Sequence, residues 1–158
     1  MDSPWVLRGS WVVLLLLFSC VPLEGHPQTF EEPYVPFPPA RPSMVNLDNI
    51  CVNEPHRPLY PLDSLPRTGY SYLRRQGDAI NGMESAYQEC CKLYGYQWLV
   101  LTLSCVQKAW KGGLSKYCVD EFSVKTKPHP CCMVEEDMHN CFATKAPNKS
   151  YTPTPTKK

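Results

Sequence analysis

The chain has 158 residues, nine cysteines and a nearly balanced formal net charge of +1. Its basic residues form no cluster of the kind that nucleic acids or heparin require, so the composition excludes a nucleic-acid-binding protein. The part of the chain predicted below to form a domain, residues 43–145, is small enough that its core alone would be marginally stable, so additional cross-links are expected.

The first 25 residues have the pattern of a secretory signal peptide. Arg8 precedes the apolar run Trp11–Phe18, which is too short to cross a bilayer as a helix. We expect cleavage between Cys20 and His26, and a secreted mature chain without a membrane span. The alternative is a lipoprotein-like sequence in which Cys20 would carry a lipid anchor.

Composition divides the rest of the chain into three parts. Residues 26–42 are rich in proline and aromatic residues, which predicts an extended, partly polyproline II linker. Residues 146–158 have little apolar surface to bury, which predicts a disordered tail. Within it, Asn148 begins an Asn-Lys-Ser acceptor and is expected to be glycosylated. Residues 43–145 are predicted to form one disulfide-rich domain.

The cysteines that follow the signal peptide repeat one pattern, a single cysteine, a doublet and a single cysteine. They are Cys51, Cys90, Cys91 and Cys105, then Cys118, Cys131, Cys132 and Cys141. An even set this dense in an exported chain predicts a disulfide framework. Zinc sites need ligand pairs that are spaced apart, so we expect no metal ion and no cofactor. Adjacent cysteines are too close to pair with each other, so the two members of each doublet must have different partners.

Apolar residues recur at helical spacing in two segments. The first runs for about sixteen residues after Asp78, and the second runs from Leu103 to Phe122. Gly112-Gly113 interrupts the second segment, where we expect a break. A short helix is expected at 133–140, and a loop at 51–76, which contains four prolines. The sequence therefore predicts an all-α fold.

The segment Tyr94–Leu103 is the best candidate for a partner-binding surface. Its large side chains are consecutive rather than periodic: Tyr96, Trp98, Leu99, Val100 and Leu101. No single helix or strand face can bury all of them, so some must face outward, where such side chains act as interface hot spots. The alternative is that the segment folds back and fills the core.

Catalytic motifs are lacking. The sequence contains neither a nucleophile elbow nor a zinc-protease motif, and its four histidines, His26, His56, His129 and His139, are scattered. Secreted phospholipase A2 has a similar cysteine doublet, but its catalytic histidine and calcium loop are missing here. Because all mature cysteines are needed for bridges, no thiolate nucleophile remains. We expect that the protein is not an enzyme.

Several motifs, taken with the cysteines around them, resemble the extracellular matrix protein 1 (ECM1) family over residues 36–151. They are Arg41-Pro42-Ser43, Leu47–Cys51, Arg75-Gln76-Gly77, the doublet at Cys90, Tyr117-Cys118, Glu121–Cys132, Cys141-Phe142 and Ala146-Pro147. That family consists of secreted glycoproteins whose repeats look like serum albumin subdomains. The resemblance implies a small all-helical, disulfide-linked domain that binds matrix components and extracellular proteases, in the extracellular space or matrix.

The albumin-like pattern also implies the disulfide pairs. The second cysteine of a doublet pairs backward and the first pairs forward, which gives Cys51–Cys91, Cys90–Cys105, Cys118–Cys132 and Cys131–Cys141. The chain differs from the family in having one complete repeat and a longer gap after Cys91. We therefore expect a secreted, matrix-associated protein-binding module. The alternatives are a carrier of a small apolar ligand and a peptide precursor cleaved at Arg74-Arg75.

Overall fold

The structure is a computed structural model that describes residues 33–52, 57–61, 63–67 and 71–152. The expected signal peptide and residues 26–32 of the expected linker lie outside this part. The described residues form helices and no strand: α2 (Leu47–Cys51), α3 (Ser71–Cys91), η2 (Tyr96–Trp98), α4 (Leu99–Phe122), η3 (Pro130–Met133) and α5 (Met138–Lys145). The all-α, disulfide-linked fold is thus the predicted one.

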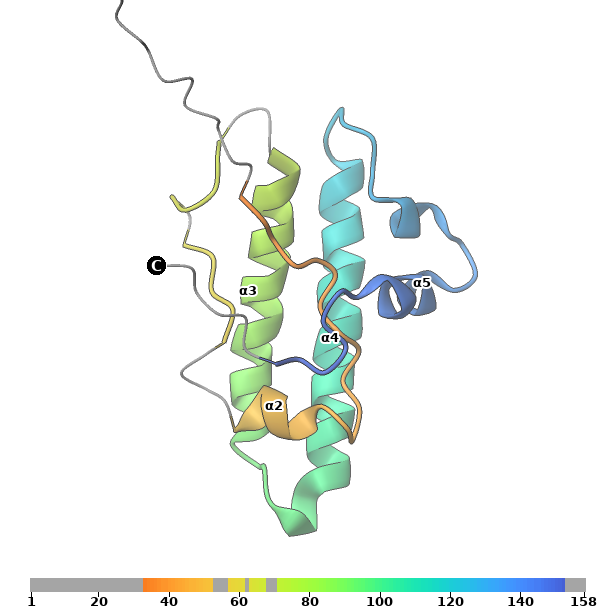
Figure 1. Ribbon diagram of the computed structural model, residues 1–158. Helices are drawn as coiled ribbons and strands as arrows, with labels where there is room; N and C mark the ends of the chain where they lie inside the picture. The colour runs from red at the N-terminus through yellow and green to blue at the C-terminus, as the bar shows by residue number, and fades with distance from the viewer. Residues whose placement is uncertain (1–32, 53–56, 62, 68–70, 153–158) are drawn as a thin grey trace, which may run out of the picture. The chain divides into compact units, whose positions relative to one another are not determined.

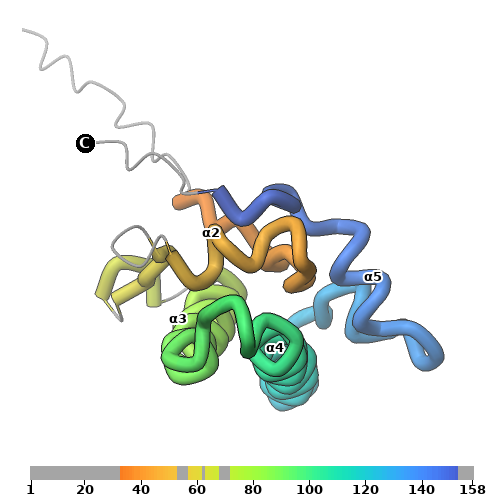
Figure 2. The backbone as a smooth tube through the Cα atoms, turned by 90° about the horizontal axis from the view of Figure 1, so that it is seen from below, coloured from red at the N-terminus to blue at the C-terminus, as the bar shows by residue number. Residues whose placement is uncertain are grey.

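Two layers make up the described residues. The long helices α3 and α4 run antiparallel beside each other (Figure 1). Seen along these two helices, α2, α5 and the segments on either side of them lie over one face of the pair (Figure 2). The core lies between the layers, because α3 and α4 each present an apolar stripe to the other and to this cover.

Regular spacing of apolar residues explains both long helices. Positions 73, 80, 83, 87 and 90 of α3 are buried, and so are positions 106, 110, 114, 117 and 118 of α4. Each of these positions lies three, four or seven residues from another in its helix, which places them along one face of that helix. The cover adds further fully buried side chains, Leu47 and Ile50 of α2 and Phe142 of α5.

Helix α3 begins at Ser71, earlier than predicted, so part of the expected loop 51–76 is helical. Gly77 lies within this helix. A Cβ atom at position 77 would stand 2.8 Å from Leu65 Cδ1 and 3.1 Å from Tyr60 Cβ. Gly77 therefore lets the chain before α3 pack closely on the helix, which the sequence pattern alone could not reveal.

The expected break at Gly112-Gly113 is also wrong, because α4 continues through both glycines. Packing of the helix against α3 offsets the weak helix propensity of glycine. The short third helix is displaced as well. It is divided into η3 and α5, and α5 begins after Asp137, whose carboxylate accepts a hydrogen bond of 3.2 Å from Asn140 N.

The proline-rich segment is part of the domain from residue 33 onward, so the linker predicted at 26–42 ends earlier than expected. Trp110 Nε1 donates a hydrogen bond of 3.0 Å to the carbonyl oxygen of Pro39. The ring of Phe37 lies 4.5 Å from that of Tyr117, and Val35 and Ala40 are buried. This proline-rich segment is thus held on the domain by its buried side chains and by the hydrogen bond from the buried Trp110.

The first part of the expected disordered tail also packs on the domain. Ala146 is buried, and the ring of Tyr151 lies 6.2 Å from that of Tyr87 in an edge-to-face arrangement. Asn46 and Asn49 donate hydrogen bonds to the carbonyl oxygens of Lys149 and Ser150. The boundary at residue 146 was therefore placed too early. Residues 153–158 lie outside the described part of the chain.

Candidate partner-binding surface

An exposed group of large apolar side chains lies where α3 is joined to α4. We call it the apolar end surface. It consists of Leu93, Tyr96, Trp98, Val100 and Leu101, whose side chains are 54%, 95%, 50%, 76% and 54% exposed. Isolated exposed apolar residues are ordinary on a protein surface, but these five fall within nine consecutive positions.

Two disulfides fix the backbone that carries this surface. Cys90–Cys105 joins the end of α3 to the second turn of α4, and so closes a loop with a sequence separation of 15. Cys51–Cys91 ties the neighbouring position to the end of α2. The Tyr94 hydroxyl donates a hydrogen bond to the Asp48 carboxylate of α2. The two disulfides therefore fix the backbone of the apolar end surface, while its side chains face solvent.

The structure separates the five side chains predicted as partner-binding candidates. Tyr96, Trp98, Val100 and Leu101 are exposed, whereas Leu99 packs against the core. The expected insertion is not an irregular loop, because η2 covers Tyr96–Trp98 and α4 begins at Leu99. Leu93 belongs to the exposed group but was missed, since its exposure follows from the turn after α3 and leaves no mark in the sequence.

The four disulfides join Cys51 to Cys91, Cys90 to Cys105, Cys118 to Cys132 and Cys131 to Cys141. These pairs are the ones that the albumin-like pattern implies. The first two hold α2, α3 and α4 together at the end that carries the apolar surface. The other two tie η3 to α4 and to α5.

A buried ion pair links the short segment before α3 to the middle of that helix. Arg57 Nη1 donates a hydrogen bond of 3.0 Å to Glu84 Oε2, and the Tyr151 hydroxyl donates to Glu84 Oε1. Burial raises the pKa of the Glu84 carboxyl to about 7, although the hydrogen bond and charge of Arg57 lower it. Two other nitrogens of Arg57 and the hydroxyl of Tyr87 are buried without a hydrogen-bond partner.

A second buried carboxylate, that of Glu121, organises the loop that leads to the second cysteine doublet. Its two oxygens accept hydrogen bonds from Arg75 Nε of α3 and, at 2.9 Å, from the backbone nitrogen of His129. Arg75 also donates to the Thr126 hydroxyl, at 3.2 Å. The His129 ring stacks on Phe142 at 5.0 Å, and burial lowers the pKa of this histidine.

One serine and one histidine lie close together, but their geometry does not fit a catalytic pair. His139 Nε2 is 3.4 Å from Ser115 Oγ and 3.2 Å from the carbonyl oxygen of Lys111. A carbonyl oxygen only accepts hydrogen bonds, so the contact with Lys111 belongs to the tautomer with the proton on Nε2, and in that tautomer Nε2 cannot take the proton of Ser115. Within the described residues, no three histidine, cysteine, aspartate or glutamate side chains are grouped as metal ligands would be.

Comparison with known proteins gives the family. The family model described as "Extracellular matrix protein 1 (ECM1)" matches residues 23–158. The chain belongs to the ECM1 family. Among curated relatives, extracellular matrix protein 1 of Rattus norvegicus is 42% identical over 116 residues, and those of Mus musculus and Homo sapiens are 40% and 39% identical over the same length.

Each of these alignments covers 73% of this chain but only 20% or 21% of the ECM1 relative, so the chain spans about a fifth of the relatives' length. No solved structure matches the chain significantly. Membership of the ECM1 family places the protein in the extracellular space or matrix, where disulfide bonds persist. Among the described helices, none is both long and apolar enough to span a membrane.

The expected glycosylation site of this ECM1 family member lies in the ordered part of the C-terminal segment. Asn148 Oδ1 accepts a hydrogen bond of 3.2 Å from the backbone nitrogen of Thr152, and Asn148 Nδ2 donates to the Thr152 carbonyl oxygen at 2.7 Å. These bonds close a turn around Tyr151, whose φ of 56° lies in the left-handed region. Asn148 itself is half-buried, and Ser150 of the acceptor sequence is exposed.

Proposed function

We propose that the protein is a non-enzymatic, protein-binding module of the extracellular matrix, and that the apolar end surface is its contact site. The observation that carries this proposal is the exposure of five large apolar side chains on a backbone fixed by two disulfides. Aromatic and aliphatic side chains of this kind dominate the binding energy of many protein interfaces.

The disulfides strengthen the argument because they reduce the entropic cost of binding. A flexible loop that becomes ordered on association loses about 1–2 kcal/mol per residue in conformational entropy. The segment between Cys90 and Cys105 is already ordered as the end of α3, the η2 turn and the start of α4. A partner that covers Tyr96 and Trp98 therefore gains apolar burial at little further cost.

Matrix proteins, including extracellular proteases, are the partners that we propose. The proposal rests on the family and on the character of the surface, which is apolar and aromatic as the centre of a protein interface is. The engagement of His139 Nε2 with the Lys111 carbonyl oxygen supports a binding role rather than catalysis.

The two alternative functions gain no support from the described residues. A peptide precursor would need an accessible, extended cleavage site, but Arg74 and Arg75 lie within α3, and Arg75 is paired with Glu121. A carrier of an apolar ligand would need an enclosed apolar cavity. The groove between the proline-rich segment, α4 and α5 is open and has two cations in its lining.

The double variant Trp98→Ser and Leu101→Ser tests the proposed contact site. A matched control is Val119→Ser and Phe122→Ser, which removes two similarly exposed apolar side chains from the other end of α4. Secretion, the thermal midpoint and retention of the labelled protein on cell-derived matrix are measured for each variant. We expect the first variant to lose at least about tenfold in matrix affinity, since one hot-spot residue contributes about 2 kcal/mol or more.

Equal retention of both variants and the unsubstituted protein would overturn the proposal. Loss of secretion, or a thermal midpoint lowered by many degrees in the first variant alone, would assign Trp98 and Leu101 to the core and likewise overturn it.

A further inference from the structure

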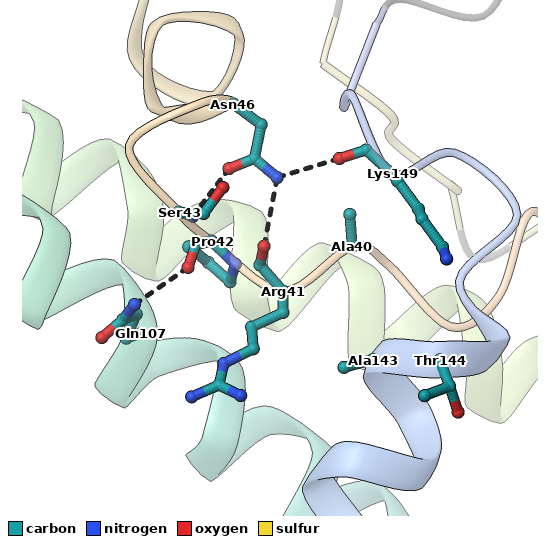
Figure 3. A pocket seen from close by; sticks show the side chains of 9 residues that line it. All are labelled: Ala40, Arg41, Pro42, Ser43, Asn46, Gln107, Ala143, Thr144 and Lys149. Carbon is teal, nitrogen blue, oxygen red and sulfur yellow. Dashed lines mark hydrogen bonds between the residues drawn. The ribbon is translucent and has the colours of Figure 1, made fainter.

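A second candidate site is a groove of about 500 Å³ beside the segment that leads into α2. The segment before α2, helix α4, helix α5 and the C-terminal segment all contribute to its walls (Figure 3). The lining residues are Ala40, Arg41, Pro42, Ser43, Asn46, Gln107, Ala143, Thr144 and Lys149. Small side chains line most of it, so backbone atoms are close to the surface of the groove.

One buried side chain holds the walls of this groove together. Asn46 is 2% exposed, and its Nδ2 donates hydrogen bonds of 3.1 Å to the Arg41 carbonyl oxygen and 3.0 Å to the Lys149 carbonyl oxygen. Asn46 Oδ1 accepts from Ser43 N at 2.8 Å. Gln107 Nε2 of α4 adds a bond of 2.9 Å to the Pro42 carbonyl oxygen. The groove is therefore formed before any ligand binds.

The charged side chains that line the groove are both cationic. Arg41 and Lys149 are exposed on two sides of it (Figure 3), and no aspartate or glutamate lines it. Within the described residues, no carboxylate forms an ion pair with either cation. Because their backbone carbonyl oxygens are bound by Asn46, the positions of both residues are fixed while their cationic ends remain available.

We propose that this groove binds an acidic peptide segment of a partner protein, at a site separate from the apolar end surface. The two cations suit carboxylates. The Ser43 hydroxyl supplies a donor and an acceptor to a peptide backbone. The Thr144 hydroxyl, which donates to the Cys141 carbonyl oxygen, and the side-chain oxygen of Gln107 supply further acceptors. A sulfated glycan presents mainly acceptors and is bound by rows of cations, so two cations with neutral acceptors between them favour a peptide.

Fluorescence anisotropy with a labelled peptide of alternating glutamate and serine tests the proposal, and the same peptide with glutamine in place of glutamate is the neutral probe. The binding variant is Arg41→Gln with Lys149→Gln. The matched control is Lys125→Gln with Lys127→Gln, which removes the same charge from exposed positions in the loop after α4. Since the acceptor Asn148 precedes Lys149, the measurement is repeated in the Ser150→Ala background, which lacks the acceptor sequence.

We expect the acidic probe to bind and the neutral probe to bind at least tenfold more weakly. Each cation removed should weaken binding by about threefold, while the control variant should bind as the unsubstituted protein does. Raising the ionic strength from about 0.01 M to about 0.1 M should also weaken binding, because it shortens the screening length from about 30 Å to about 10 Å.

Equal binding of the two probes would overturn the proposal, as would equal loss in the binding and control variants. A heparin fragment that binds in an Arg41- and Lys149-dependent manner, without any binding of the acidic peptide, would replace it with a glycan site. Neither result bears on the apolar end surface, because none of the substituted residues lies there.

Discussion

Gly113 of α4 lies directly against Met83 of α3. A Cβ atom at position 113 would stand 2.3 Å from Met83 Cγ and 3.0 Å from its sulfur atom. The neighbouring Gly112 is exposed, and a Cβ atom there would have no neighbour within 4 Å. The two adjacent glycines therefore have different roles: the first is incidental, whereas the second permits the close approach of the two long helices.

Alanine at each glycine separates these roles. Gly113→Ala should lower the unfolding free energy by about 1–2 kcal/mol, because overpacking costs about 1–3 kcal/mol and improved helix propensity returns up to about 1 kcal/mol. Gly112→Ala should raise it by about 0.5–1 kcal/mol through propensity alone. Denaturant unfolding of the two variants is the measurement. Stabilisation by Gly113→Ala would show that Met83 moves aside freely.

The two glycines show which features of the fold can be predicted from the sequence alone. Periodicity locates α3 and α4, but a helix propensity argument predicts a break wherever two glycines meet. The packing of Gly113 on Met83 depends on a residue 30 positions away in the sequence. Gly77 of α3 is likewise buried against Tyr60 and Leu65, which precede the helix in the sequence. Tertiary contacts override local propensity at both places.

The candidate site was predictable in part. The consecutive apolar residues after Tyr94 indicate that some must be exposed, and Tyr96 and Trp98 are. Which of these side chains packs against the core depends on where α4 begins. Helix α4 begins at Leu99, after the η2 turn and within the loop that the Cys90–Cys105 bridge closes. The cationic groove could not be predicted, because Arg41 and Lys149 are brought together only by the long-range hydrogen bonds of Asn46.

Glu84 should make the stability of the domain depend on pH. Its pKa is about 7 in the folded chain, above the ordinary value of 4.5, so the folded state binds this proton more tightly than the unfolded state does. The contribution of Glu84 to stability is therefore fully present below pH 4.5 and is lost as the pH rises through about 7. The loss is at most about 3 kcal/mol, since one pKa unit corresponds to about 1.4 kcal/mol.

Glu84→Gln isolates this contribution. Arg57, Tyr87 and Tyr151 surround the carboxyl. The glutamine amide removes its titration, together with the charge that pairs with Arg57 and one of the two acceptor oxygens, so the pH dependence of the stability is compared rather than its absolute value. His129 acts in the opposite direction, because its lowered pKa favours the folded state as the pH rises. Both proteins are denatured at several pH values from 4.5 to about 7. The free energy of unfolding of the unsubstituted protein should fall relative to that of the variant as the pH rises. A constant difference would contradict the raised pKa of Glu84.

Two variants of the acceptor sequence should differ in stability while both lose the glycan expected at Asn148. Ser150→Ala should give a sharper, faster band on electrophoresis and keep the thermal midpoint, because the bond from Asn49 reaches the Ser150 backbone. Asn148→Gln should give the same band but loosen the C-terminal segment, since the turn bonds to Thr152 are lost. A glycosidase-treated sample provides the reference band. Unchanged mobility in both variants would show that the acceptor is unused.

The disulfide pairs can be tested directly by peptide mapping without reduction. Proteolysis should release one cross-linked cluster that holds Cys51, Cys90, Cys91 and Cys105 and a second that holds Cys118, Cys131, Cys132 and Cys141, because each doublet stays on one peptide. Partial reduction of each cluster then assigns the partner of each doublet cysteine. A free thiol, or a bridge between Cys90 or Cys91 and any cysteine from Cys118 onward, would contradict the arrangement of the helices.

Removing one bridge should separate stability from binding. Cys90 and Cys105 replaced by alanine open a loop with a sequence separation of 15, and Cys118 and Cys132 replaced by alanine open one of 14. Loops of this length give similar entropic stabilisation, about 3 kcal/mol, so both variants should unfold at similarly lower denaturant concentrations. Only the variant that lacks the Cys90–Cys105 bridge should also lose affinity for cell-derived matrix, because only that variant frees the backbone that carries Tyr96 and Trp98. The segment must then become ordered when a partner binds, and the lost conformational entropy weakens binding. Retention is measured at a temperature where circular dichroism shows both variants folded. Equal matrix affinity of the two variants would mean that the Cys90–Cys105 bridge stabilises the fold without preparing the apolar end surface for a partner.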